Sequence, residues 1–579
     1  MASSLLAVTL ALLPRPPSQA SGARRWPCRP LSHPGSERRR APPLHASLEE
    51  AVESDGVVVI GSGIGGLSCA CLLARYRVPV LVLESHVHAG GAAHSFTRRG
   101  YTFDSGPSLW AGLARPSVNP LRQVLDAVEE SSSIEWAEYD GWGMVLPEGR
   151  FFFRTGDDKS WEATLDAFGG RSSREQWAQL LRTTAPVTRA SAATPPMVLR
   201  SDPWVLLPLL RCLPGLLTAA PHAALLNGPF SATMDAAQLK DPFVKAWLDY
   251  LAFALSGLDA RGTLGAAVAF TLGDLYRPGA TLDYPIGGSG AVIEALCSGV
   301  AKFGGEVRTG AHVERLLVEG GRAAGVVLRS GEVIRAGRAV VSNADVWATV
   351  GLIPPEYRPP PRQGGGGALN AALPMTPSFM HLHLGFRGGE GLPEGLGIHY
   401  SVILDDFYDI EAERNMVIIS IPTLLDPALA PDGHHVLHAY YAADEPYEAW
   451  EKVQPGTAEY DALKVERAAP LWTAVERIIP DIRSRVVVEM VASPLTHERF
   501  LRRSRGTYGP PLFAGDDGQT IPYAKTQLEG LLHCGDSCFP GIGVPSAAAS
   551  GINAANTLVS PWLQLALMNE LDSKGQLNP

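Results

Sequence analysis

Cysteine and charged residues are scarce in this sequence. Cysteine occurs 7 times in 579 residues, and Lys, Arg, Asp and Glu together make up 19%. An odd number of irregularly spaced cysteines does not form a disulfide framework, although a single bridge between Cys534 and Cys538 stays possible. These two cysteines have no second pair to complete a metal site, because the other close pair, Cys69 and Cys71, falls in a predicted helix. We therefore expect no metal.

A long uninterrupted hydrophobic run is also missing. The longest charge-poor stretch, residues 212–234, is broken by Pro214, Pro221 and Pro229, whereas a membrane-spanning helix needs about 20 continuous apolar residues. We expect this stretch to form the wall of a hydrophobic cavity or a patch on a membrane surface. An ordinary buried pair of helices fits the sequence equally well.

The first 48 residues are poor in acidic residues. They contain seven arginines and many serines but one acid, Glu37, which is the composition of an organellar transit peptide. The apolar run LLAVTLALL could instead be the core of a secretory signal peptide, although no basic residue precedes it. This leader carries +7 − 1 = +6, so the remaining body is near −10 − 6 = −16. Such an acidic body argues against nucleic acid as a partner.

A nucleotide-binding motif follows the leader. Residues 57–60 form a short β-branched run, typical of a buried parallel strand, and Gly61, Gly63 and Gly66 then complete G-x-G-x-x-G. Gly61 permits a tight turn, Gly63 lets the backbone approach a pyrophosphate, and Gly66 lets the next helix pack on the sheet. The free N–H groups at the start of that helix would bind the phosphates.

A second buried strand ends at Glu84, 23 residues after Gly61. An acid here accepts hydrogen bonds from a ribose with a free 2′-hydroxyl and repels a 2′-phosphate, which argues against NADP. A glycine-rich turn without a ligand is the alternative, but the ordered strand, glycines, helix, strand and acid favour a nucleotide site. The candidate cofactor-binding residues of this motif are Gly61, Ser62, Gly63, Gly65, Gly66 and Glu84.

Paired glycines and a Gly-Pro loop come next. The segment HAGGAAHSFTRRGYTFDSGPS contains Gly90 and Gly91 before a short polar-aromatic run, and Gly106 and Pro107 at its end. It resembles the second FAD signature of the amine oxidase and phytoene desaturase superfamily. There the paired glycines run beside the diphosphate, and the Gly-Pro loop passes near the isoalloxazine ring. The resemblance favours FAD over NAD; a structural hairpin beside a loop is the alternative.

Two motifs near the C-terminal end narrow the resemblance. THERFLRRSRGTYGP (496–510) and CGDSCFPGIGVPSAAASG (534–551) are similar to the paired C-terminal motifs of plant and cyanobacterial carotenoid isomerases. The resemblance runs from residue 56 to about 562. It implies that Val313 contacts the adenine, that Asp536 reaches the ribityl and phosphate region, and that a helix N-terminus faces the flavin N1/O2 edge. The residues that it assigns to this pocket wall are Gly535, Asp536, Gly543, Val544 and Pro545.

The predicted fold is of the α/β class and has two domains. One is a FAD-binding Rossmann-type domain, and the other is a discontinuous substrate domain that combines a mixed sheet with helices. The length of the whole chain suggests three or four structural units, and a content of 46% hydrophobic residues permits a large core. FAD-binding parts are expected at 56–145, 285–353 and 491–562, a helical, membrane-facing substrate part at 146–284, the substrate sheet with its helices at 369–490, a transit peptide at 1–48, a linker at 354–368 and a C-terminal tail at 563–579.

The resemblance implies an FAD-dependent enzyme that performs redox-neutral cis–trans isomerisation of a carotene polyene with reduced flavin. A desaturase or saturase with net redox change shares the layout, and a lipid-binding module like the Rab dissociation inhibitors shares the fold without flavin. Ala92 stands where amine oxidases have an arginine, which argues against an amine substrate. The expected partners are a hydrophobic polyene and a membrane surface, and the expected location is the plastid, with the mitochondrion as alternative.

No nucleophile or acid–base pair stands out. In SFMHLHLGF, His381 and His383 fall on one face of an alternating strand and could ligate a metal, but no third ligand follows at a recognisable spacing. An ordinary polar face or pocket lining is favoured. The candidates for an acid–base role are Asp405, Asp406, His383 and Tyr508, although a structural role is favoured for each.

Overall fold

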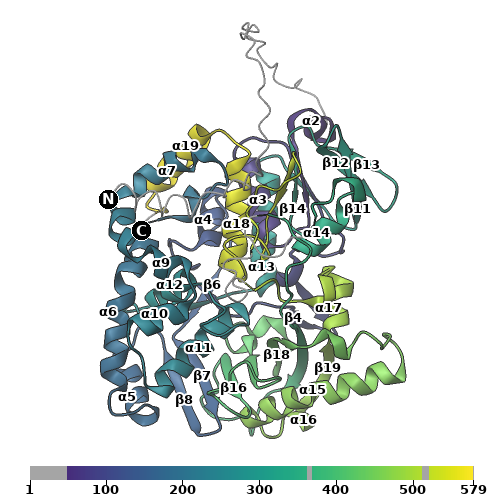
Figure 1. Cartoon of the computed structure of the whole chain (residues 1–579). Coiled ribbons are helices and arrows are strands. Elements are labelled where there is room, and N and C mark those ends of the chain that lie inside the picture. Colours follow the sequence, from purple (N-terminus) through teal and green to yellow (C-terminus); the bar gives the residue numbers. More distant parts are fainter. Residues whose placement is uncertain (1–47, 193, 361–367, 512–520, 578–579) are drawn as a thin grey trace, which may run out of the picture.

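The computed structural model describes residues 48–192, 194–360, 368–511 and 521–577. The predicted transit peptide, except for residue 48, and residues 361–367 of the predicted linker lie outside the described residues. Figure 1 shows a sheet with its helices in the upper part, a second sheet in the lower part, and a group of helices along one side.

The upper sheet has five parallel strands in the order β10-β2-β1-β14-β20. Short runs of β-branched and aliphatic residues form it because both of its faces are covered. Its strands come from three distant parts of the chain, as predicted for a discontinuous FAD-binding domain. They are β1 (Val57–Ile60), β2 (Val80–Leu83), β10 (Glu306–Arg308), β14 (Ala339–Ser342) and β20 (Leu531–His533).

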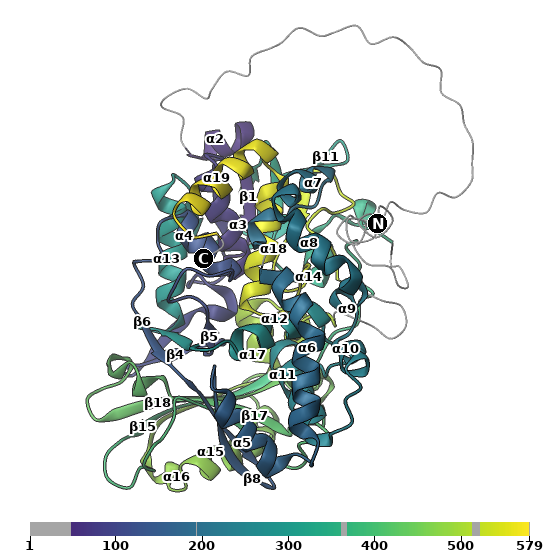
Figure 2. The ribbon, with the colours of Figure 1, turned by 90° about the vertical axis from the view of Figure 1, so that its left-hand side faces the viewer.

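Helices α3 (Ile64–Arg75) and α18 (Val544–Thr557) lie side by side against this sheet (Figures 1 and 2). They approach closely because glycines meet at the contact: a Cβ on Gly551 would be 2.2 Å from the Gly65 carbonyl oxygen. Helix α13 (Ser289–Lys302) packs on the other side of α3. The predicted meander is present as β11 (Val313–Glu319), β12 (Arg322–Leu328) and β13 (Val333–Arg335), paired antiparallel.

The lower sheet has seven strands in the order β19-β15-β18-β17-β16-β7-β8, antiparallel except for the β16–β7 pair. One face packs against the long helix α15 (Ala458–Ile478) through Leu382, Leu437 and Leu471. The strands are β7 (Gly141–Leu146), β8 (Gly149–Arg154), β15 (Ser378–Arg387), β16 (His399–Ile403), β17 (Met416–Ser420), β18 (His434–Glu445) and β19 (Val486–Ala492).

Two predicted boundaries are wrong. The division between 56–145 and 146–284 cuts the β7–β8 hairpin, which belongs to the lower sheet and not to the FAD-binding domain. The predicted tail at 563–579 is mostly helix α19 (Pro561–Ser573), which buries Leu567, Met568 and Leu571 in the core around α3. Sequence composition does not reveal either boundary, because the residue pattern of a hairpin or an amphipathic helix is the same whichever domain it packs on.

A helical layer covers one side of both sheets (Figure 2). It packs around an aromatic core in which Trp161 lies between Trp247 and Trp177, at centroid distances of 4.7 and 5.2 Å. No helix of the described residues is long and apolar enough to cross a membrane. The main helices are α5 (Asp158–Phe168), α6 (Ser173–Ala192), α10 (Phe230–Ala236), α11 (Pro242–Ser256) and α12 (Gly265–Leu275), with short helices α7 (Leu206–Leu209), α8 (Leu213–Ala219) and α9 (Ala223–Asn227) between α6 and α10.

Candidate active site

A cavity of about 950 Å³ runs between the two sheets. At one end it reaches the carboxyl ends of the parallel strands, where ligands of open α/β sheets bind. At the other end its floor is the face of the seven-stranded sheet that points away from α15. We call these the nucleotide end, around Gly61–Gly66 and Glu84, and the substrate end, around His381, His399 and Tyr440.

The glycine turn after β1 has little space for side chains. Gly61 has φ +91°, a conformation that L side chains rarely adopt, and a Cβ on Gly66 would lie 2.2 Å from its carbonyl oxygen. A Cβ on Gly63 would be 2.8 Å from Asn343 Nδ2, and one on Gly65 would be 2.8 Å from the Gly535 nitrogen. Asn343, which the sequence analysis missed, therefore sits beside the turn. The glycines leave the space in front of this turn free for a ligand. The free main-chain N–H groups at the start of α3 can bind that ligand.

Glu84 ends β2 and faces the cavity, as predicted. Its Oε2 accepts hydrogen bonds from the Ser62 nitrogen (2.9 Å) and hydroxyl (2.6 Å), and its Oε1 accepts one from the His86 nitrogen (2.7 Å). The Ser85 hydroxyl also donates to Oε1, at 3.4 Å, so a ribose hydroxyl would compete with this long bond for the carboxylate. Ser62 does not line the cavity; it holds Glu84 and also accepts a hydrogen bond from the Gly90 nitrogen at 3.1 Å. Gly66 likewise lies behind the lining.

The segment with Gly90, Gly91, Gly106 and Pro107 packs against the first glycine turn. Gly90 (φ +115°) and Gly91 (φ +56°) adopt left-handed conformations, and Gly90 forms an isolated bridge with Gly63. Gly106 and Pro107 line the cavity, and a Cβ on Gly106 would be 2.5 Å from the Ala92 carbonyl oxygen. The two glycine motifs thus meet on one wall.

The C-terminal motifs line the cavity beside the glycine turn. Helix α18 begins after Gly543 (φ +99°), with Pro545 in its first turn, and both residues line the cavity together with Val544. Gly535 and Asp536 line it after β20, and Val313 lines it at the start of β11. The structure therefore brings fourteen of the sixteen predicted cofactor residues to one cavity end. They are Gly61, Gly63, Gly65, Glu84, Gly90, Gly91, Gly106, Pro107, Val313, Gly535, Asp536, Gly543, Val544 and Pro545.

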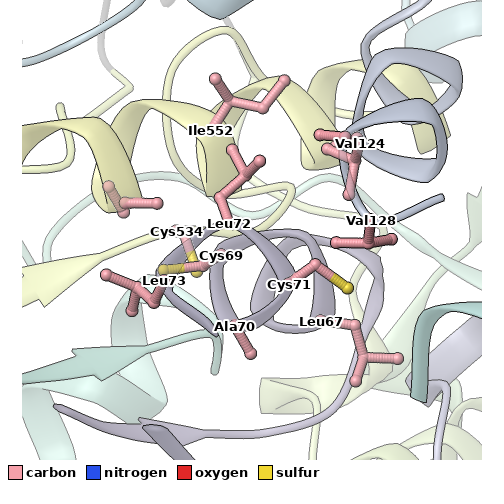
Figure 3. Close-up of a cluster of buried hydrophobic side chains, with 14 of the residues drawn as sticks. Leu67, Cys69, Ala70, Cys71, Leu72, Leu73, Val124, Val128, Cys534 and Ile552 are labelled. Carbon is pink, nitrogen blue, oxygen red and sulfur yellow. The ribbon is translucent and has the colours of Figure 1, made fainter. Parts of the chain in front are cut away.

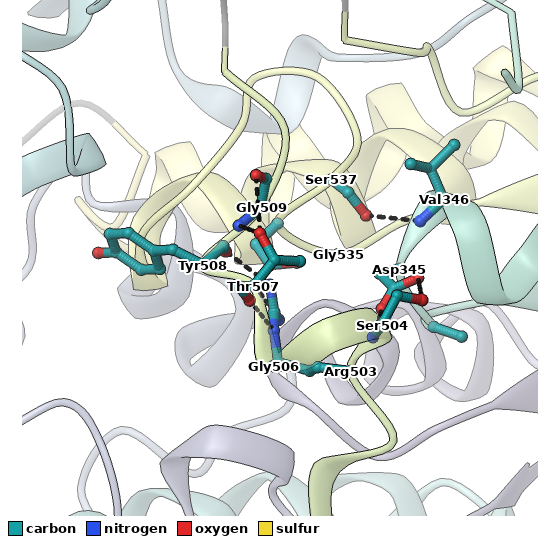
Figure 4. Close-up of polar contacts among 12 residues, drawn as sticks. Asp345, Val346, Arg503, Ser504, Gly506, Thr507, Tyr508, Gly509, Gly535 and Ser537 are labelled. Atoms are coloured by element: carbon teal, nitrogen blue, oxygen red, sulfur yellow. Dashed lines mark hydrogen bonds and ion pairs between the residues drawn. The ribbon is translucent and has the colours of Figure 1, made fainter. Parts of the chain in front are cut away.

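An arginine that the sequence analysis missed fixes the two C-terminal motifs to each other. Arg503 Nη1 donates to Asp536 Oδ2 at 2.6 Å, and its Nε donates to the Thr507 carbonyl oxygen at 2.7 Å. Nearby, Asp345 Oδ2 accepts from the Ser504 nitrogen at 2.7 Å (Figure 4). These bonds join the loop before Tyr508 to the ends of β14 and β20, and so position the wall near the cofactor.

The cysteines of the C-terminal motif do not line the cavity; the Cys534 thiol lies behind the lining and donates to Asn343 Oδ1 at 3.7 Å. Cys534 packs beside Cys69 among Leu72 and Ile552 (Figure 3). The Cys538 thiol donates to the His533 carbonyl oxygen at 3.4 Å. The six cysteines of the described residues are free thiols, so the open possibility of a Cys534–Cys538 bridge is not realised. Burial raises the pKa of both thiols, which keeps them protonated and unreactive.

The floor of the substrate end carries polar and aromatic side chains on alternate positions. The strand register pairs His381 with Tyr440 and His383 with His438, so all four side chains stand on the same face. Ser401 and His399 follow on β16, two positions apart. The intervening positions, such as Leu382 and Leu437, face α15 and are apolar. One period-2 pattern therefore separates a dry core from a polar cavity floor.

Three histidines on this floor form a hydrogen-bonded chain. His381 Nδ1 lies 2.7 Å from His438 Nε2, and His381 Nε2 lies 2.8 Å from His497 Nε2. Burial lowers the pKa of His381 and of His438 well below the usual value and that of His497 to about 3. The chain is therefore neutral at physiological pH. Each neutral ring has one donor and one acceptor, so a concerted shift of tautomers can pass a proton along it.

The four predicted acid–base candidates differ in their position relative to the cavity. Asp405 and Asp406 are exposed on the loop after β16 and lie outside the cavity lining, which contradicts their candidacy. His383 lies behind the lining, 3.2 Å from the Asp104 carbonyl oxygen through Nε2, and burial lowers its pKa to about 4. Tyr508 lines the cavity, and burial raises its pKa. In the chain as described, no group of three or more His, Cys, Asp or Glu side chains is placed to hold a metal.

Comparisons with known proteins agree with this geometry. The model of the family described as flavin containing amine oxidoreductase matches residues 64–559, and the chain belongs to this family. The fold also matches solved structures, among them cyclohexylamine oxidase from Brevibacterium oxydans IH-35A, with a TM-score of 0.53 and 16% identity over 90% of this chain and 100% of that one. A second is an oxidoreductase from Methanosarcina mazei, with a TM-score of 0.54 and 19% identity over 86% of this chain and 99% of that one.

Within this family the chain is similar to carotenoid and retinoid enzymes. It is 30% identical over 543 residues to the chloroplastic prolycopene isomerase of Arabidopsis thaliana, covering 89% of this chain and 85% of the relative. It is 26% identical over 535 residues to the all-trans-retinol 13,14-reductase of Homo sapiens, covering 83% and 82%. The predicted fold and the predicted cofactor, FAD, are confirmed. The glycine turns, Glu84 and the start of α18 fit FAD, because a Cβ would obstruct the turns and the acid lines the same end of the cavity.

Proposed function

We propose that the protein is an FAD-dependent enzyme that modifies a carotenoid or a similar polyene, with redox-neutral cis–trans isomerisation as its reaction. The observation that carries this proposal is the continuity of one cavity from the FAD cradle to a lining rich in leucine and alanine. An extended apolar substrate can lie in this cavity and reach the cofactor without contact with water. The similarity to prolycopene isomerases supports the choice of polyene.

When bound, reduced flavin can donate an electron or a hydride reversibly, which lowers the bond order of a polyene double bond. The residues of this chain bind the flavin and the polyene and orient them relative to each other. The N–H groups at the start of α18 would favour negative charge on a flavin ring bound beside them. On the substrate side, Leu251, Leu255 and Phe270 line the cavity and exclude water. Isomerisation needs no net proton, and no residue is required as acid or base.

A net redox reaction is the second candidate. The neutral chain of His497, His381 and His438 favours it, because a saturase or desaturase must deliver or remove a proton at the substrate. His497 and His381 line the cavity and could pass that proton. The similarity to retinol reductases and phytoene desaturases supports this alternative. A non-catalytic lipid-binding module is disfavoured, because such a module has no use for Glu84 and the open glycine turns.

One experiment separates the candidates. The FAD-loaded protein is incubated with poly-cis carotenes and a reductant without oxygen, and products are analysed by chromatographic retention and mass. We expect a shifted isomer of unchanged mass. A mass change of two hydrogens would replace isomerisation by the redox candidate, and protein that never retains FAD would favour the lipid-binding module. Protein stripped of flavin is the control and should give no product.

We further propose a plastid location and contact with a membrane surface. The acid-poor leader and the chloroplastic names of the plant relatives support the location. Trp204, Leu210 and Trp562 are 59%, 62% and 67% exposed around the neighbouring helices α7 and α19. Exposed aromatic and apolar side chains of this kind enter the interface of a bilayer. Sedimentation with plastid-lipid vesicles should fall several-fold in a Trp204→Ser/Trp562→Ser variant; unchanged binding would refute the contact.

A further inference from the structure

Polar atoms without hydrogen-bond partners gather at the substrate end of the cavity. His399 is 2% exposed, lines the cavity and makes no hydrogen bond of ordinary geometry through Nδ1 or Nε2. Ser108 is 1% exposed, lines the cavity, and its hydroxyl is likewise unpartnered. The Ser108 main chain lies beside the His399 ring and partly opposes the lowering of its pKa by burial. A buried polar group left unpaired costs about 1–3 kcal/mol, so two of them at one site point to a ligand.

Further hydroxyl groups surround these two residues. Tyr139 stacks on His399 with ring centroids 5.4 Å apart, and its buried hydroxyl is also unpartnered. Tyr250 and Ser401 exchange a hydrogen bond of 2.8 Å on the same floor. Burial raises the pKa of Tyr440 to about 12, so it is a neutral phenol, and the Ser108 hydroxyl lies close enough to oppose this shift without a hydrogen bond of ordinary geometry. The site is thus a set of neutral donors and acceptors inside an otherwise apolar cavity.

The charge of the site excludes an anionic ligand group. Burial lowers the pKa of His399 to about 3, so the ring is neutral at pH 7. Among the described residues that line the cavity, the basic ones other than histidine are Arg502 and Arg503, both from the C-terminal motif at the nucleotide end. The acid Asp274 lines the substrate end. A carboxylate or phosphate here would be buried without a counter-charge, which costs several kcal/mol.

A hydroxyl group matches the site. It donates one hydrogen bond and accepts others, and a neutral imidazole offers one acceptor and one donor. Resting on the proposed function, we propose that the substrate is an oxygenated polyene: an isoprenoid chain with a hydroxyl group that binds His399 and Ser108. A hydrocarbon carotene would leave both side chains unsatisfied. The hydroxyl then fixes the register of the chain in the cavity, and so selects the double bond presented to the cofactor.

The test measures binding by the FAD-loaded protein without turnover, through quenching of tryptophan fluorescence. The probes are two matched pairs, retinol with its deoxy hydrocarbon and zeaxanthin with β-carotene; retinoic acid serves as the anionic probe. We expect the alcohol of at least one pair to bind about tenfold more tightly than its hydrocarbon, from one or two added hydrogen bonds. We also expect retinoic acid to bind more weakly than retinol. Alcohols that bind no better than their hydrocarbons in either pair would overturn the proposal.

Variants locate the effect. His399→Phe keeps a ring against Tyr139 but removes both nitrogens, and it should abolish the preference for the alcohol. Ser108→Ala should reduce the preference several-fold. His435→Phe is the matched control, because His435 is a strand histidine outside the cavity lining that pairs with Thr423. A His399→Phe protein that keeps the preference, or one that loses FAD along with it, would contradict a direct contact with substrate.

The outcome is distinguishable from that of the proposed function. If the protein converts hydrocarbon and hydroxylated polyenes equally well and shows no binding preference, the inference fails and the proposed function stands. If the alcohols bind preferentially but no polyene is converted, the proposed function fails and the hydroxyl site stands.

Discussion

The two ends of the cavity are built from different parts of the polypeptide. The nucleotide end consists mainly of main chain, exposed by glycines at Gly61, Gly63 and Gly90. The substrate end consists of side chains such as His381, His399 and Tyr440, which four strands of one sheet bring to a common face. A main-chain site depends on local turns, whereas a side-chain site depends on register between distant segments. The nucleotide end should therefore lose its ligand when an added side chain takes up space. The substrate end should lose its ligand preference when a single polar atom is removed.

The largest expected effect is loss of the nucleotide end through one methyl group. In Gly66→Ala, the new Cβ would lie 2.2 Å from the Gly61 carbonyl oxygen, which is main chain and cannot move aside. We expect a loss of about 3 kcal/mol or more of folding free energy, together with loss of bound FAD. Thermal unfolding and flavin absorbance after gel filtration measure both effects.

Gly351→Ala provides the matched control, because Gly351 also lies in a helix, α14 (Val346–Leu352), and nothing lies within 4 Å of its Cβ position. This variant should be unchanged or up to about 1 kcal/mol more stable, since alanine favours helix. A Gly66→Ala protein with normal FAD content would show that the turn has more freedom than its geometry implies.

The second prediction concerns Glu84, the acid that follows β2 at the nucleotide end. Glu84→Gln places an amide where carboxylate oxygens now accept from the nitrogens of Ser62 and His86. Hydrogen bonds to a charged group contribute about 1.5–3 kcal/mol, so FAD affinity should fall about 10- to 100-fold. Dialysis followed by flavin fluorescence measures the retained cofactor. Glu314→Gln, a cavity-edge acid paired with Arg329, should retain FAD normally; equal losses in both variants would refute a specific role.

The contrast between the two ends also explains what sequence could predict. The glycines, Glu84 and the Gly-Pro turns were predicted residue by residue, because each motif is contiguous and its spacing encodes a turn geometry. Asn343 was missed because it follows a strand without a motif. The role of Arg503 was missed because segment 496–510 holds several arginines, and its spacing does not indicate which of them reaches Asp536. The histidine floor was only partly visible: alternation placed His381 and His383 on one face. His438 and His399 join them through strand pairing, and His497 through the packing of helix α17 (Pro494–Leu501), neither of which a local pattern encodes. Asp405 and Asp406 were misjudged because acidity alone does not indicate proximity to a cavity.

The third prediction tests the neutral, buried character of the substrate end. A histidine whose folded pKa is about 3, as for His399, remains neutral while the unfolded state takes up a proton below its ordinary pKa of 6.5. Acid therefore favours unfolding between about pH 6.5 and pH 3, and stability returns as pH rises through this window. From pH 7 to pH 5 this residue alone should cost about 2 kcal/mol. Buried carboxyl groups with raised pKa, such as Asp104, oppose the trend.

Comparison of variants isolates the histidine from this background. His399→Phe should flatten the dependence of the unfolding free energy on pH between 7 and 5 by about 2 kcal/mol, measured by urea denaturation at each pH. Asp405→Asn, at an exposed acid outside the cavity, should leave the curve unchanged. A His399→Phe curve parallel to that of the unmodified protein would mean that the ring titrates in the folded state.

The smallest expected effect comes from a side chain at the nucleotide end. Cys534 is fully buried on the α3 side of β20, and its thiol does not reach the cavity. In Cys534→Ala we expect a cost of about 1 kcal/mol from the lost sulfur contacts, and no change in FAD content, in turnover or in sensitivity to thiol reagents. Because Gly535 and Asp536 present the main chain and the acid that face the cofactor, the neighbouring thiol is dispensable. Loss of FAD in this variant, without a matching loss of stability, would show that the nucleotide end depends on side chains as the substrate end does.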